Sequence, residues 1–239
     1  MGNAYYASDA TRAAKVHTLF ARIAPRYDLI NDLQSFGLHR LWKRRLVRFA
    51  GARIGLRAID LCCGTGDVGF ALARTGAEVT GLDFSEEMLA VAKQRKSSGD
   101  PGKIEFLHGD ALKIPFPDAH FDIVTMSYGL RNLADFAGGL REMHRVVRPG
   151  GRIVILDFGK PPNRLWRSLY FGYLRFAVPI FGRLFCGDAA AYAYILESLQ
   201  HYPGQEGVSA VLRELGCANV RVTNLLGGVM SLNYADKAL

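Results

Sequence analysis

After residue 55, two kinds of segment follow each other regularly along the chain. Short, nearly continuous apolar runs are separated by longer segments in which apolar residues recur at helical spacing. Continuous apolar runs are typical of strands covered on both faces, and the wider spacing is typical of amphipathic helices. The predicted strands are residues 57–61, 78–82, 104–108, 121–127 and 152–158, and the predicted helices are 67–74, 86–96 and 136–147. This order predicts an α/β fold with a doubly wound, mostly parallel sheet.

Capping and breaking residues support these boundaries. Ser85 is suited to cap the helix that follows it, and Glu86 and Glu87 place negative charge in the first turn of that helix. The Pro-Gly-Gly run at 149–151 predicts the end of the third helix and its separation from the strand at 152–158.

The first predicted strand ends in a glycine turn. Gly64 and Gly66 allow backbone conformations with positive φ and let a ligand approach the chain closely. Gly64, Gly66 and Gly69 also satisfy the dinucleotide pattern Gly-x-Gly-x-x-Gly, and Asp83 follows at about the distance expected of a ribose-binding acid. An NAD-dependent oxidoreductase is therefore one possible interpretation.

Two carboxylates flank the same turn, Asp60 and Asp67. They would repel a pyrophosphate, whereas they suit a cationic ligand such as S-adenosylmethionine. The methyl donor is thus the favoured cofactor, and the NAD interpretation requires both acids to point away from the turn. A cofactor-binding scaffold without activity is a third alternative.

Polar residues also follow the other predicted strands, at the edge where such sheets bind ligands. Asp83 is expected to accept hydrogen bonds from the ribose hydroxyls and Asp110 to contact the adenine amino group, with Ala111 leaving room for the ring. The cofactor-binding residues predicted in this way are Asp60, Gly64, Thr65, Gly66, Asp67, Asp83, Asp110, Ala111 and Ser127.

Composition narrows the function only a little. With 239 residues, the chain has room for one domain or for a domain with an insertion, and its net charge of +8 suggests an anionic partner surface.

The four cysteines show no C-x-x-C spacing and no matching histidine cluster, so neither a metal site nor a disulfide framework is indicated. The N-terminus lacks the apolar core of a signal peptide, and we expect a cytoplasmic protein without a nucleic-acid partner. The oligomeric state stays open.

Several segments together are similar to one family. They are residues 27–43 (YDLINDLQSFGLHRLWK), 116–118 (FPD), 127–132 (SYGLRN) and 145–151 (RVVRPGG), with Asp188, Tyr192, Tyr194 and the Glu197-Ser198 pair. In these segments and in the glycine turn, the chain resembles the ubiquinone/menaquinone C-methyltransferase (UbiE-like) family of class I S-adenosylmethionine-dependent methyltransferases. Where the family usually has methionine, this chain has Ile30, a change that conserves volume.

The resemblance implies a Rossmann-like, seven-stranded sheet with N-terminal helices and a helical lid insertion. It implies a single methyltransferase domain, with N-terminal helices at 1–54, a cofactor-binding core at 55–160, a substrate lid at 161–203, and a C-terminal helix and strands at 204–239. It also adds Tyr27 to the expected cofactor-binding residues.

The same resemblance implies a prenylated quinol as the methyl acceptor. The Cys62-Cys63 pair and the Leu-Asp-Phe ending at 156–158 resemble the naphthoquinone branch of the family, which favours conversion of demethylmenaquinol to menaquinol. A ubiquinone-type benzoquinol stays open as the alternative.

Arg131 and Asn132 are the expected catalytic residues, because they follow the fourth strand and are suited to hold a ring oxygen. For Arg131 the alternative is a salt bridge at the sheet edge. His39 and His201 are possible bases by their ordinary pKa.

Two segments are candidate membrane-surface contacts. Residues 38–48 form a basic helix around Trp42, for which a solvated face is the plain alternative. Residues 165–185 are apolar and aromatic, but three arginines and Pro179 interrupt them, which argues against a membrane span. A lid that receives a lipophilic tail and touches the inner face of the membrane peripherally is the preferred interpretation, and simple core packing is the alternative.

Overall fold

The structure is a computed structural model, and the residues described from it are 15–16, 18, 31–32, 34–97, 102–186 and 190–239. Tyr27 and Asp188, both named above, lie outside these residues, and so does the side chain of Tyr192.

One seven-stranded sheet forms the centre of the molecule, with the strand order β3-β2-β1-β4-β5-β7-β6. Its strands are β1 (Arg57–Leu61), β2 (Glu78–Asp83), β3 (Ile104–His108), β4 (Phe121–Ser127), β5 (Val147–Phe158), β6 (Cys217–Leu225) and β7 (Met230–Lys237). Strands β1 to β5 pair in parallel, whereas β7 runs antiparallel to both β5 and β6. The prediction of a doubly wound, mostly parallel sheet is confirmed.

The start of β5 corrects one predicted boundary. The Pro-Gly-Gly run does not separate helix from strand, because β5 already begins at Val147 and pairs there with Phe121. The next pair is Ile123 with Arg152, so residues 148–151 form an irregularity within the strand. A bulge tolerates Pro and Gly where a regular ladder does not, since its residues need not donate to the neighbouring strand.

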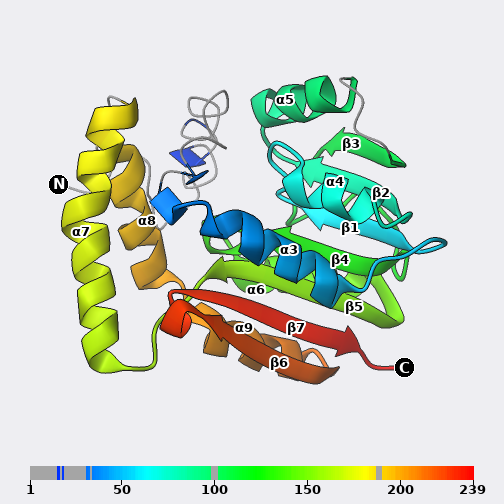
Figure 1. The fold of residues 1–239 in the computed structure, drawn as a ribbon. Helices are drawn as coiled ribbons and strands as arrows, with labels where there is room; N and C mark the ends of the chain where they lie inside the picture. The colour runs from blue at the N-terminus through cyan, green and yellow to red at the C-terminus, as the bar shows by residue number, and fades with distance from the viewer. Residues whose placement is uncertain (1–14, 17, 19–30, 33, 98–101, 187–189) are drawn as a thin grey trace.

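Helices cover both faces of the sheet (Figure 1). The helices α3 (Leu38–Ala50) and α4 (Asp67–Ala73) pack on one face, and α6 (Phe136–Val146) and α9 (Gly204–Glu214) pack on the other. Helix α5 (Glu86–Ser97) packs against β2 and β3. Short 3-10 turns, η2 (Leu130–Asn132) and η3 (Leu226–Gly228), follow β4 and β6.

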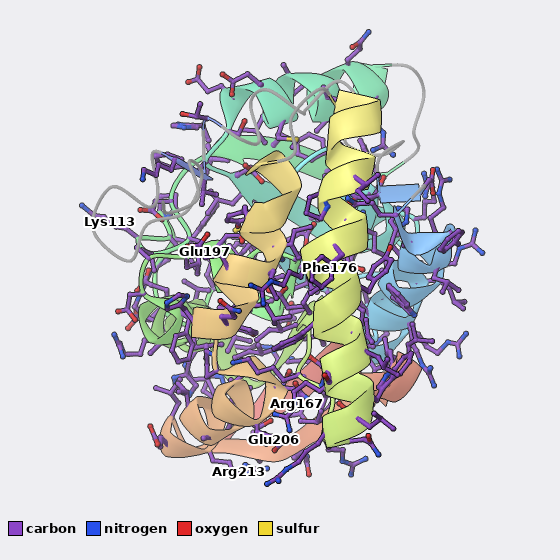
Figure 2. The ribbon with its side chains drawn as sticks, turned by 90° about the vertical axis from the view of Figure 1, so that its left-hand side faces the viewer. Lys113, Arg167, Phe176, Glu197, Glu206 and Arg213 are labelled. Carbon is purple, nitrogen blue, oxygen red and sulfur yellow. The ribbon has the colours of Figure 1, made fainter. Side chains whose placement is uncertain are left out.

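Two further helices cross the edge where the parallel strands end. Helix α7 (Arg164–Cys186) is the outermost element on that side of Figure 1, and α8 (Ala190–His201) packs beside it. Figure 2 looks onto this pair, with Phe176 labelled on α7 and Glu197 on α8. No helix among the described residues is long and apolar enough to cross a membrane.

Trp42 does not lie on the surface as a membrane contact would. The inward face of α3 carries Trp42, Leu46 and Ala50 at helical spacing, and Trp42 is only 8% exposed. The prediction of an interfacial Trp42 is therefore wrong, because burial of this face against the sheet removes the indole from solvent. The arginines at 44, 45 and 48 are exposed, in agreement with a solvated charged face.

Candidate functional site

A cavity of about 160 Å³ opens at the carboxyl ends of β1 to β4. Its walls come from the last residues of these strands and the loops after them, together with Met88 of α5 and Val16 near the N-terminus. The predicted residues that line it are Gly64, Asp83, Asp110, Ala111, Ser127 and Asn132. Six of the residues predicted from the sequence are therefore brought together around one cavity.

The glycine turn forms the wall that β1 contributes. Gly64 and Gly66 have φ values of 55° and 89°, in the left-handed region that favours glycine. A Cβ at Gly66 would lie 2.8 Å from the Phe70 ring and 2.9 Å from the Phe106 ring, whereas one at Gly64 would meet nothing within 4 Å. Gly66 is thus required by packing against its neighbours, and Gly64 leaves open space on the cavity side.

Asp83 links the turn to the end of β2. One carboxylate oxygen accepts a hydrogen bond from the Gly64 amide at 2.7 Å, and the other accepts one from the Ser85 amide at 2.9 Å. Burial raises the pKa of Asp83 above its ordinary value, opposed by these backbone amides. Each oxygen keeps lone-pair capacity, so the group can still accept hydrogen bonds from a ligand.

Asp110 and Ala111 form the wall beyond β3. Asp110 accepts a hydrogen bond from the Leu112 amide at 2.8 Å, which holds the carboxylate in a tight turn at the cavity edge. Ala111 is buried, with 5% of its surface exposed. Its small side chain gives the wall a flat, apolar patch beside the carboxylate.

Asp60 and Asp67 do not line the cavity, contrary to the sequence-based expectation. Asp60 is fully buried and accepts a hydrogen bond from the Thr125 hydroxyl at 2.7 Å, and burial raises its pKa to about 7. Burial also disfavours the Asp67 carboxylate, but ion pairs with Lys43 and Arg95, each at 2.8 Å, outweigh this and lower its pKa to about 2. Among the described residues, the carboxylates that line the cavity are those of Asp83 and Asp110. The charge argument for a cationic ligand therefore rests on those two acids.

Thr65 and Gly66 are likewise absent from the residues that line the cavity. Thr65 is 1% exposed and its carbonyl accepts a hydrogen bond from Arg95 at 2.8 Å, while Gly66 caps α4. Their positions indicate that both residues stabilise the glycine turn and do not themselves line the cavity.

Arg131 is part of a buried ion pair. Its guanidinium donates to Asp157 at 2.9 Å and to the Tyr128 carbonyl at 2.8 Å, and it lies 4.4 Å from the centre of the Phe158 ring. Arg131 and Asp157 are 5% and 2% exposed. This is the salt-bridge alternative weighed above, and Arg131 does not line the cavity.

Asp157 was not among the residues selected from the sequence. It is the penultimate residue of the buried strand β5, and Asp83 is the last residue of β2; this similar position near a strand end was the signal that could have found it.

Asn132 lines the cavity directly. Its amide nitrogen donates to the Tyr128 carbonyl at 3.2 Å, and its amide oxygen accepts a hydrogen bond from the hydroxyl of Tyr194 on α8. Neither histidine proposed as a base lines the cavity. His39 is buried beside Ser35, which lies 2.8 Å from its Nδ1, and His201 is exposed at the end of α8.

Comparison with known proteins identifies the family. Residues 8–237 match the model of the ubiE/COQ5 methyltransferase family. The chain belongs to this family. Within it, the chain is 40% identical over 237 residues to the demethylmenaquinone methyltransferase of Staphylococcus aureus strain JH9, covering 97% of each protein.

Solved structures share the fold of this ubiE/COQ5 family member. A putative S-adenosyl-L-methionine-dependent methyltransferase from Methanococcus maripaludis superimposes with a TM-score of 0.62 at 21% identity, covering 92% of this chain and 94% of that one. A SAM-dependent methyltransferase from Aquifex aeolicus gives a TM-score of 0.59 at 20% identity, covering 81% and 88%. Membership of a methyltransferase family decides between the cofactor interpretations of the glycine turn in favour of the methyl donor.

Proposed function

We propose that the protein transfers a methyl group from S-adenosylmethionine to a ring carbon of demethylmenaquinol, giving menaquinol. The observation that carries this proposal is the 40% identity, over 97% of both chains, to a demethylmenaquinone methyltransferase. The cavity at the carboxyl end of the sheet supports it, since ligands of doubly wound folds bind at this edge.

The groups that line the cavity suit the methyl donor in charge and in hydrogen-bonding capacity. Asp83 is positioned to accept hydrogen bonds from the ribose hydroxyls, and Asp110 with Ala111 offers a carboxylate beside a flat apolar surface for the adenine. Open space above Gly64 lets the cofactor approach the backbone, and Ser127 adds a hydroxyl at the end of β4. Tyr27 stays a predicted contact outside the described residues.

When bound, S-adenosylmethionine supplies an electrophilic methyl group on a sulfonium centre. The chain must then orient the quinol ring, stabilise its deprotonated oxygen and exclude water. Asn132 reaches the cavity and is suited to donate an N–H to that oxygen. Arg131 is kept from direct contact by its pair with Asp157, so we assign it the positioning of the loop that carries Asn132.

The decisive experiment is a methylation assay with the purified protein, S-adenosylmethionine and short-tailed demethylmenaquinol kept reduced. Mass spectrometry should find a product that carries one additional methyl group in place of a ring hydrogen and is therefore heavier than the substrate by the mass of CH2. The oxidised quinone is the control and should give no product, because it has no ring hydroxyl to deprotonate. If only a benzoquinol with the same tail is methylated, the substrate is the benzoquinol and not demethylmenaquinol. Methyl transfer to neither quinol would contradict the proposed function.

We further propose that the protein works at a membrane surface, because its expected substrate carries an isoprenoid tail. One face of α7 is apolar and exposed, and it lies on the outermost helix at the site end of the sheet (Figure 2). Its residues are Leu165, Leu169, Tyr173, Phe176 and Ile180. Exposed arginines at 164 and 175 adjoin this face. Each would contribute about 1 kcal/mol near anionic lipid, so binding should be reversible and sensitive to salt.

Liposome co-sedimentation tests this contact. Phe176, which is 70% exposed, is changed to Ser together with Leu169, and the wild-type protein should pellet with anionic vesicles far better than the variant. Ile54→Ser is the matched control, since Ile54 is 83% exposed but lies at the opposite end of the sheet, before β1. Equal pelleting with neutral and anionic vesicles, or equal loss in the control, would contradict the proposal.

A further inference from the structure

We propose that Tyr194 is a positioning residue, through which the lid helix α8 holds the Asn132 amide in the orientation needed to bind the ring oxygen of the substrate. This inference rests on the proposed function. It names Tyr194 as a further residue and Asn132 as the residue through which it acts, and the family match supplies neither role.

The amide orientation of Asn132 is defined at both ends. Its nitrogen donates to the Tyr128 carbonyl at 3.2 Å, and its oxygen accepts a hydrogen bond from the Tyr194 hydroxyl. A flipped amide would set the Asn132 oxygen against the Tyr128 carbonyl, which can only accept. Both contacts therefore select the same orientation.

This orientation leaves donor capacity for a ligand. An amide has two N–H donors and two acceptor positions. Within the described part of the chain, the Asn132 amide uses one N–H and one oxygen lone pair. Because the side chain lines the cavity, the second N–H is available to an oxygen of the bound ring.

Burial makes the contact with Tyr194 effective. Tyr194 is 1% exposed and Asn132 is 9% exposed, so little water competes for the hydrogen bond between them. In a buried chain of hydrogen bonds each member polarises the next. Donation from Tyr194 to the amide oxygen therefore strengthens the amide N–H as a donor.

The backbone of Tyr128 supports the same arrangement. Tyr128 has a φ of 61°, an uncommon conformation for a residue other than glycine. Its carbonyl accepts from both Arg131 and Asn132, at 2.8 and 3.2 Å. The buried Arg131 thus holds the Tyr128 carbonyl, and Tyr194 of α8 holds the Asn132 amide. Of the two neighbouring residues 131 and 132, the uncharged Asn132 is the one that lines the cavity.

The test is the Tyr194→Phe variant, which removes the hydroxyl and keeps the ring. With demethylmenaquinol as substrate, kcat should fall about three- to tenfold, the effect of one lost hydrogen bond. The Kd for S-adenosylmethionine, measured by calorimetry, should stay unchanged because Tyr194 does not line the cofactor cavity.

A double-mutant cycle with Asn132→Ala identifies the route of action. If Tyr194 acts through Asn132, Tyr194→Phe should lower kcat no further in the Asn132→Ala background. Additive losses would overturn the proposal and indicate that Tyr194 acts on the substrate by itself or through packing.

Tyr170→Phe on α7 is the matched control. It also removes a buried lid hydroxyl, one that has no hydrogen-bond partner among the described residues. Its kcat should stay within twofold of wild type, and a loss equal to that of Tyr194→Phe would overturn the inference. If the wild-type protein methylates neither quinol, the proposed function fails. If the wild-type protein is active and Tyr194→Phe is fully active, only the inference fails.

Discussion

Replacement of Arg131 by Met should destabilise the protein strongly, because it leaves a buried carboxylate without its counter-ion. Met keeps much of the side-chain length but supplies neither charge nor donors. In the wild type the Arg131 guanidinium lies 2.9 Å from Asp157, and both side chains are almost fully buried. A buried ion left unpaired keeps its desolvation penalty and loses the attraction that offset it.

The size of the effect follows from the contacts that survive. Removing one partner of a buried pair costs about 3–5 kcal/mol of unfolding free energy. In the wild type the backbone amides of residues 131 and 158 also donate to Asp157, at 3.1 and 2.8 Å, and the substitution leaves both donors in place. We therefore expect the lower end of that range, about 3 kcal/mol.

Urea unfolding measures this loss, with Arg141→Met as the control. Arg141 also pairs with an aspartate at 2.9 Å, Asp135, but both side chains are more than half exposed, so its removal should cost less than about 1 kcal/mol. The double variant Arg131→Met/Asp157→Asn should recover part of the stability by removing the unpaired charge. A loss in Arg131→Met no larger than in Arg141→Met would refute the structural role of the pair.

Three further predictions concern the acids in and around the glycine turn, Asp83, Asp67 and Asp60. Asp83→Ala should weaken S-adenosylmethionine binding by about 1.5–3 kcal/mol in calorimetry, and unchanged affinity in the folded variant would remove Asp83 from the site. Because the pKa of Asp67 is lowered from 3.8 to about 2, its contribution to stability is present above pH 4 and lost as the pH falls toward 2. The free energy of unfolding, measured over this pH range, should show this loss in the wild type and not in Asp67→Asn. The pKa of Asp60 is raised to about 7, so its contribution is present below pH 4 and lost as the pH rises through 7. Asp60→Asn should flatten the pH dependence of unfolding in that range, and an unaltered profile would contradict the assigned shift.

The alternation of apolar runs and helical segments was sufficient to predict the parallel strands. The bounds of β1, β3 and β4 agree with the predicted strands residue for residue. The start of β5 was missed, since a Pro-Gly-Gly run breaks regular structure locally but is tolerated in a bulge. The burial of Trp42 could have been inferred from its helical spacing with Leu46 and Ala50.

Side-chain directions at the site were harder to predict, because they depend on partners distant in the sequence. Asp67 is drawn from the turn by Lys43 and Arg95, which come from two helices on either side of it in the chain. Arg131 is paired with Asp157 on the neighbouring strand, 26 residues away. The sequence left a salt bridge open as the alternative for Arg131, but it did not identify Asp157 as the acid, because that pairing depends on β5 lying beside β4 in the folded sheet.

The backbone at the cavity rim sets a limit on how far heat resistance can be increased without loss of turnover. Cys62 and Tyr128 both line the cavity and both adopt left-handed conformations, with φ values of 52° and 61°. Such conformations cost about 1–3 kcal/mol each in residues other than glycine. Glycine at 128 would relieve that cost, yet it would also free the carbonyl that orients Arg131 and Asn132. Thermally adapted variants of this chain are therefore expected to gain their stability away from the rim, on surfaces such as α9, and to leave these two positions strained.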